Sequence, residues 1–149
     1  MLRILILALL PLPLLAADAG AQVEYVGGTM TAIPGKVGGK LDVTGAETLR
    51  LHIRQVAIEV PYERINMLEY GQTVGRRYAE AILISPLMLL AKKRKHFLTV
   101  GFTDPEGRQQ AMVFQVDKGH VRSVLVSLEA KTGRKVEFQD EEARKAGKG

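Results

Sequence analysis

Short segments in which apolar and polar residues alternate are the feature that most limits the folds open to this chain. Thr48–Ile53 reads TLRLHI and Val56–Tyr62 reads VAIEVPY, so every second residue is large and apolar in both. Side chains of a strand point to opposite faces in turn, so this period predicts antiparallel strands with one buried and one solvated face. Further strand candidates are residues 22–33, 40–43, 64–71, 96–104 and 109–117, with 135–138 as a short addition.

The clearest predicted hairpin joins His96–Asp104 to Gln109–Asp117. HFLTVGFTD and QQAMVFQVD both alternate, and DPEG stands between them. DPEG has aspartate first, proline second and glycine fourth, which is the order that a tight turn favours. Elsewhere, Gly27-Gly28 predicts a bulge or bend and residues 34–39, PGKVGG, predict a flexible turn.

The last part of the chain predicts one amphipathic helix. Apolar residues at the spacing i, i+3, i+4 and i+7 form a narrow stripe of Val121, Val124, Leu125 and Leu128. Asp117 is placed to cap the start of the helix, and Gly133 is placed to end it. Residues 139–149 are charged and small, so we expect them to be a disordered tail.

Residues 1–21 predict a cleaved secretory signal. Arg3 precedes an apolar run from Ile4 to Leu15, and small residues follow. The run is shorter than the roughly 20 residues of a spanning helix, and two prolines interrupt it. Small residues allow cleavage after Ala21, which we favour, or after Ala19. The protein is therefore expected to be exported, either periplasmic or secreted, with one β domain over 22–138.

Composition narrows the classes of partner. The formal charge is +5, which is compatible with anionic lipid, an envelope polymer or nucleic acid. Export, the absence of tryptophan and an aromatic content of 5% argue against nucleic acid, which single-strand binders hold by stacking. The chain has no cysteine, so its core must be held without disulfides or a thiolate metal site.

The segment between the predicted strands, residues 76–95, is the candidate contact surface. Helix formers predict a short helix over 76–85, a break at Pro86 and a further turn to Ala91. Its apolar side chains are candidates for membrane or partner contact, and its cations are candidates for binding an anionic surface. The apolar group is Leu87, Met88, Leu89 and Leu90, and the basic group is Arg76, Arg77, Lys92, Lys93, Arg94 and Lys95. Alternatively, residues 82–91 are core and the cations only solubilise its edge.

Catalytic and metal-binding patterns are missing from the sequence. His52, His96 and His120 have no metal-ligand spacing, and no G-x-S-x-G nucleophile motif is present. The glycine clusters lack the spacing of a phosphate-binding loop. We therefore expect no enzyme activity, no cofactor and no metal.

The order of these elements resembles the pleckstrin-homology-like superfold. The specific likeness lies in Lys92–Phe138, KKRKHFLTVGFTDPEGRQQAMVFQVDKGHVRSVLVSLEAKTGRKVEF, with a weaker likeness in Val60–Gly71, VPYERINMLEYG. It is similar to the last hairpin and helix of such domains in exported bacterial proteins of unknown function. The resemblance implies a mainly β fold, a partly open antiparallel barrel of about seven strands capped by a C-terminal amphipathic helix.

Two departures limit what the resemblance implies. The C-terminal helix lacks the tryptophan of eukaryotic members, so Leu125 or Leu128 would fill that position. The lysine and arginine pattern that grips phosphoinositides is not visible over 34–54, so that activity is not carried over. The expectation is an exported, non-catalytic binding module that contacts anionic lipid or envelope components through 76–95. The alternative is a protein-interaction or structural domain, for instance one that accepts a strand at an open sheet edge. An enzyme is the third and weakest hypothesis.

Overall fold

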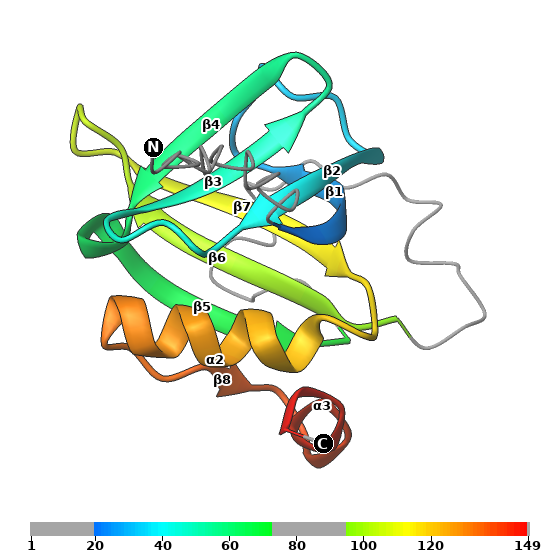
Figure 1. The fold of residues 1–149 in the computed structure, drawn as a ribbon. Helices are drawn as coiled ribbons and strands as arrows, with labels where there is room; N and C mark the ends of the chain where they lie inside the picture. The colour runs from blue at the N-terminus through cyan, green and yellow to red at the C-terminus, as the bar shows by residue number, and fades with distance from the viewer. Residues whose placement is uncertain (1–19, 73–94, 149) are drawn as a thin grey trace, which may run out of the picture.

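The computed structural model describes residues 20–72 and 95–148, which form one curved sheet with helices at one side (Figure 1). The helices are η1 (Tyr62–Arg64, a single 3-10 turn), α2 (Val121–Thr132) and α3 (Glu141–Lys148). The strands are β1 (Ala21–Gly28), β2 (Val37–Asp42), β3 (Thr48–Ile53), β4 (Val56–Pro61), β5 (Ile65–Gly71), β6 (Phe97–Thr103), β7 (Gln109–Val116) and β8 (Glu137–Phe138).

The sheet has eight strands in the order β4-β3-β2-β1-β7-β6-β5-β8. The first seven strands pair antiparallel, and β8 pairs parallel with β5. The predicted mainly β class with a C-terminal helix is confirmed. The sheet is not closed into a barrel, since β4 and β8 are its two ends. The helix predicted between strands over 76–91 and residues 1–19 lie outside the described residues.

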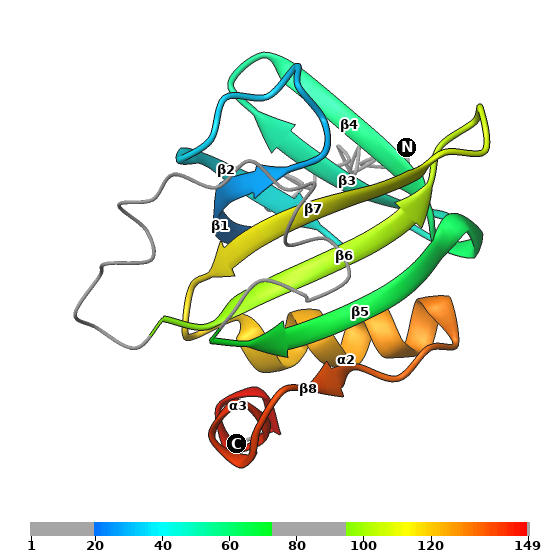
Figure 2. The same ribbon diagram turned by 180° about the vertical axis from the view of Figure 1, so that it is seen from behind.

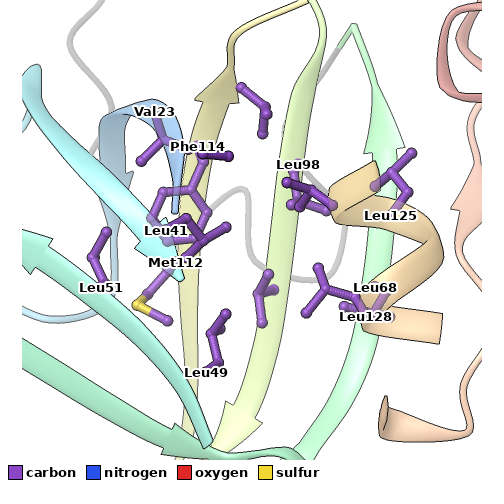
Figure 3. Packing of buried hydrophobic residues seen from close by; sticks show 14 of the residues in the cluster. Val23, Leu41, Leu49, Leu51, Leu68, Leu98, Met112, Phe114, Leu125 and Leu128 are labelled. Carbon is purple, nitrogen blue, oxygen red and sulfur yellow. The ribbon is translucent and has the colours of Figure 1, made fainter. Parts of the chain in front are cut away.

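The core lies on the concave side of the sheet, where α2 covers it. Figure 3 shows Leu125 and Leu128 of α2 beside Leu68 and Leu98 of the sheet. All four residues of the predicted helix stripe are buried, which confirms the amphipathic pattern. Burial of side chains of this size stabilises a fold by about 1.5–3 kcal/mol each, so the α2 stripe is a large part of what holds the helix on the sheet.

The ends of α2 differ in one respect from the prediction. Gly133 ends the helix as expected, with φ of 68° and its N–H donating to the Glu129 carbonyl. The N-cap residue is His120, not Asp117. Asp117 instead closes the turn before the helix, where its carboxylate accepts from the Gly119 N–H at 3.2 Å and its carbonyl from the His120 N–H at 2.9 Å.

The glycines near the start of the domain lie within paired strands as well as in turns. The register of β1 against β7 shifts between Tyr25 and Gly27, which confirms the predicted bulge. The turn predicted over 34–39 is partly wrong, because β2 already begins at Val37. A Cβ on Gly39 would lie 2.6 Å from the His52 carbonyl oxygen, so β2 and β3 approach too closely there for any larger residue.

Half of the sheet is buried on both faces, contrary to the single solvated face that alternation predicts. On β6, all of Phe97–Phe102 is buried. One set of its side chains, including Leu98 and Val100, belongs to the core under α2. A second set on the opposite face lies outside that core cluster yet is at most 8% exposed: Val26, Met67, Phe97, Ala111 and Val113. Strands β5, β6 and β7 therefore form a two-sided hydrophobic layer, whereas β3 and β4 keep one solvated face.

Matched truncations on the two faces test this two-sided burial. We expect Val113→Ala on the outer face and Val100→Ala on the inner face to lower the free energy of unfolding by similar amounts, on the order of 2 kcal/mol each, because both side chains are fully buried. Denaturant unfolding of the two variants measures this. A change below about 0.5 kcal/mol for Val113→Ala, the level of a surface substitution, would contradict burial of the outer face.

Residues 139–148, expected to be disordered, instead include helix α3. Asp140 begins it, with its carboxylate accepting from the Ala143 N–H at 2.7 Å. Ala143 is fully buried, and Gly147 is buried against Phe138 of β8 and Leu125 of α2. The helix docks because small residues on one side allow a close approach, while its charged residues remain exposed.

Enlarging Gly147 should detach α3. A Cβ there would lie 2.6 Å from Phe138 Cε1 and 2.9 Å from Leu125 Cδ1, so Gly147→Val must move the helix. We expect amide protection over 141–148 to fall by an amount that corresponds to about 1–3 kcal/mol of local stability. Hydrogen exchange measures this, with Ala146→Val as the control because it places the same side chain at an exposed position of the same helix. Equal protection in the two variants would contradict the docking.

Candidate functional site at the edge of β4

The residues that the sequence predicts as a contact surface are mostly outside the described ranges. This holds for Arg76, Arg77, Leu87–Leu90 and Lys92–Arg94, so their predicted role is not tested. Lys95 is described; it is half-buried and precedes β6. The three histidines are not brought together: His52 is on β3, His120 caps α2 and the His96 ring stacks on Tyr70 with centroids 5.5 Å apart. Over residues 20–72 and 95–148, no three metal-ligating side chains converge.

The edge of the sheet at β4 is the first part of the candidate site. At the other end of the sheet, β8 pairs with Glu69 and Tyr70 of β5 and so covers part of that edge. In the described part of the chain, no strand pairs with the outer side of β4. A strand in this position presents unpaired backbone donors and acceptors, which makes it a template for a further strand.

The pairing of β3 with β4 shows which backbone groups face outward. A two-residue turn joins the strands, so Ile53 and Val56 are a hydrogen-bonded pair and every second pair after them is bonded too. The Tyr62 N–H, which donates to the Glu47 carbonyl at 2.9 Å, continues the same alternation. The N–H and C=O groups of Ala57 and Glu59 therefore point away from β3.

The position of Pro61 agrees with this assignment of the outward-facing backbone groups of β4. It occupies the next outward position of β4, opposite Thr48, where an N–H would face away from the sheet. Proline lacks that N–H, so it is tolerated at an edge position of this kind and excluded from an inward one. The outer edge of β4 therefore has two residues that can pair fully, Ala57 and Glu59, with Ile58 between them. It ends at Pro61, which can accept a hydrogen bond but cannot donate one.

Side chains beside the edge are partly uncovered. Val56 is 58% exposed, which is unusual among the large apolar residues of 20–72 and 95–148, and Ile58 is half-buried on the same face. On the other face, the Glu59 carboxylate accepts from Arg50 Nε at 2.9 Å. Both partners of this ion pair are about half exposed, so it adds at most about 1 kcal/mol to stability.

A cavity of about 290 Å³, which we call the corner cavity, lies where β4 ends. The end of β4 and the turn between β6 and β7 are neighbours in both ribbon views (Figures 1 and 2). Apolar lining comes from Val60, Pro61, Phe102 and Pro105, and polar lining from Thr48, Glu59, Arg64, Thr103 and Asp104. The cavity shares three consecutive residues with β4, so an added strand would reach it.

One wall of the corner cavity is fixed by the predicted DPEG turn. The Asp104 carboxylate accepts from the Glu106 N–H at 3.0 Å, from the Arg108 N–H and Nε at 2.8 Å each and from Gln110 Nε2 at 3.0 Å. Burial opposes ionisation of Asp104, but the hydrogen bonds from Gln110 and Arg108 outweigh it and lower its pKa to about 2. Asp104 is therefore a fully engaged anion that holds the turn.

The stability that Asp104 contributes should depend on pH in a defined direction. Its folded pKa of about 2 lies below the ordinary 3.8, so this contribution is complete above about pH 5 and is lost as pH falls towards 2. We expect Asp104→Asn to unfold at lower temperature than the wild type at pH 7, with the gap narrowing as pH falls. Thermal unfolding over this range measures it. Glu106→Gln, an exposed carboxylate in the same turn, is the control, and a gap independent of pH would contradict the assignment.

Sequence reasoning located β4 but missed that it is an edge. The usable signals are Pro61 and Glu59, since proline and charge are typical of edge strands. The corner cavity had no signal, because Glu59 and Arg64 lie far from Asp104 in the chain.

No known protein-family model matches this chain, and no curated protein matches it. Within the described ranges, no helix is long and apolar enough to cross a membrane. The site must therefore be interpreted from its own geometry.

Proposed function

We propose that the protein is an exported, non-catalytic binding module of the pleckstrin-homology-like kind, which accepts an extended polypeptide as a strand added to β4. The observation that carries this proposal is the outward direction of the backbone groups of Ala57 and Glu59. An extended peptide that pairs with a sheet edge gains affinity from the main chain and specificity from pockets beside it. The corner cavity is such a pocket.

The order of elements supports the pleckstrin-homology-like assignment. β1–β4 and β5–β7 are two antiparallel meanders, and α2 follows the second. Leu125 and Leu128 are buried at 3% and 0% exposure, in keeping with a role in place of the missing tryptophan. The fold alone supports many functions, so the binding proposal depends on the β4 edge and not on the resemblance.

Export remains part of the proposal, and the structure bears on where a signal would be cut. Ala21 is the first residue of β1, is 7% exposed and pairs with Leu41. Cleavage after Ala21 would remove this residue from the strand, whereas cleavage after Ala19 would leave β1 whole. The position of Ala21 therefore favours the earlier of the two cleavage sites that the sequence allows.

Backbone hydrogen bonds at the β4 edge supply only part of the free energy that a stable complex needs. Ala57 and Glu59 each offer one donor and one acceptor, and each hydrogen bond formed is worth about 0.5–1.5 kcal/mol net. The four together supply about 2–6 kcal/mol, less than the 8.2 kcal/mol of a micromolar complex. Backbone pairing therefore needs side-chain contacts beside it, and the exposed Val56 and the corner cavity are the nearest places for them.

Proline substitution at Ala57 tests strand addition. Because the Ala57 N–H faces outward, Ala57→Pro removes a donor from the free edge without removing one from the β3–β4 pairing. We expect peptides selected on the wild-type protein from a random linear library to lose affinity for Ala57→Pro about tenfold or more. Isothermal titration calorimetry measures this. Ala57→Thr, which keeps the donor, is the matched control and should bind as the wild type does.

Thermal unfolding accompanies the binding measurement, because Ala57→Pro must remain folded for the comparison to count. If it unfolds, Glu59→Pro at the other outward position replaces it, with Glu59→Gln as control. Equal affinity of the proline and control variants for the selected peptides would overturn the proposal.

Contact with anionic lipid through residues 76–95 stays a prediction of the sequence and defines the competing outcome. Co-sedimentation with phosphatidylglycerol vesicles, compared with phosphatidylcholine vesicles, measures it. Preference for the anionic vesicles that disappears when Lys92–Lys95 are changed to glutamine, together with no effect of Ala57→Pro on any ligand, would favour the lipid function over strand addition.

A further inference from the structure

The corner cavity is a continuation of the β4 edge, so its chemistry bears on which polypeptide the edge accepts. The inference below rests on the proposed strand addition and concerns the side chains of the added segment. Glu59, Val60 and Pro61 belong both to the edge strand and to the cavity lining. A segment that pairs with Ala57 and Glu59 and continues past Pro61 therefore passes the cavity mouth.

The size and lining of the corner cavity favour one apolar side chain. Its volume of about 290 Å³ is just below the range of about 300–1,000 Å³ that is typical of sites for small molecules and cofactors. Val60 and Phe102 are 2% and 6% exposed, so the part they line is firmly held in the core. Pro61 and Pro105 extend the apolar surface outward on two sides.

The charged groups around the cavity are not equivalent. Glu59 is neutralised by Arg50 at 2.9 Å, and Asp104 is engaged by Arg108 and Gln110. Arg64 is the remaining charged residue of the lining. Across residues 20–72 and 95–148, no carboxylate forms an ion pair with Arg64. The cavity therefore presents two satisfied anions and one cation that still has its donors available.

An unpaired arginine beside an apolar hollow selects for a carboxylate. The guanidinium group presents donors in a planar fork that matches the two oxygens of a carboxylate, and such charge-assisted bonds are about twice as strong as neutral ones. Arg64 follows Pro61 by one turn of η1, so it lies just beyond the end of the pairing edge. An acidic group on an added strand would reach Arg64 after the residue that enters the cavity.

We propose that the β4 edge selects an extended segment with an apolar residue followed closely by a carboxylate, the apolar side chain entering the corner cavity and the carboxylate binding Arg64. The carboxylate is that of an aspartate or glutamate side chain or of a chain terminus. The pairing edge fixes the register of the segment, the cavity selects the apolar residue, and Arg64 selects the charge next to it.

The test compares selected peptides with their neutral forms. A random linear peptide library is selected on the wild-type protein, and we expect the enriched sequences to carry an apolar residue followed within a few positions by an acid. Replacing that acid by its amide should weaken binding about tenfold for the wild type, as expected for loss of a charge-assisted bond. For Arg64→Gln the same replacement should change affinity less than about twofold.

Several controls separate the outcomes. Arg122→Gln on α2, an exposed arginine that is not part of the cavity lining, should retain the full preference for the acid. Amidating the peptide terminus, compared with changing an internal acid to its amide, distinguishes the two sources of the carboxylate. Thr48→Trp, which fills the cavity from β3, should reduce the preference for the apolar residue while the effect of Ala57→Pro persists.

Failure of this inference is distinct from failure of strand addition. If Ala57→Pro abolishes binding but Arg64→Gln keeps the preference for the acid, the Arg64 assignment is wrong and strand addition stands. If Ala57→Pro has no effect, strand addition itself is wrong. A selected set without enriched acids also overturns the assignment of Arg64.

Discussion

A β-strand presents backbone donors and acceptors on both of its sides, so an open sheet leaves one side of each end strand without a full strand partner. The two ends are treated differently. At β5, the short strand β8 pairs in parallel and α3 packs beside it, so the chain supplies its own cover. At β4, the described chain supplies none. The sheet bends without closing, so it has a concave side, which α2 covers. The same bend brings the end of β4 beside the β6–β7 turn, where the corner cavity lies.

The parts of the fold that the sequence predicts well are those fixed by local chemistry. DPEG determines the β6–β7 turn, because Asp104 can bind the following backbone N–H groups and glycine ends the turn. The predicted strand ends at this hairpin differ from those of β6 and β7 by at most one residue. The stripe of α2 and its stop at Gly133 are equally local, since spacing and backbone conformation alone define them.

The parts that could not be predicted depend on contacts between distant residues. The tail contains charged residues and small ones, with no large apolar side chain to predict a packed helix. Yet the small size of Ala143 and Gly147 is what lets α3 approach Phe138 and Leu125. The sequence predicts that Gly39 belongs to a turn, but in the structure a glycine is required there because the His52 carbonyl oxygen lies too close for a side chain. Pro61 and Glu59 are typical of an edge strand, but which strand becomes an edge is a property of the whole topology. The corner cavity is visible in no short stretch, because β4 and the β6–β7 turn line it together.

The contrast between one-sided and two-sided burial also has a dynamic consequence. Local opening costs least where the fewest apolar groups are buried, and in β4 only Val60 is fully buried, whereas β6 is buried almost throughout. Strand β4 of the β3–β4 hairpin is thus less firmly anchored than strands β6 and β7. A segment that pairs with β4 would take up some of the hairpin's conformational freedom, so recognition at this edge carries an entropic cost that a stiffer strand would not impose.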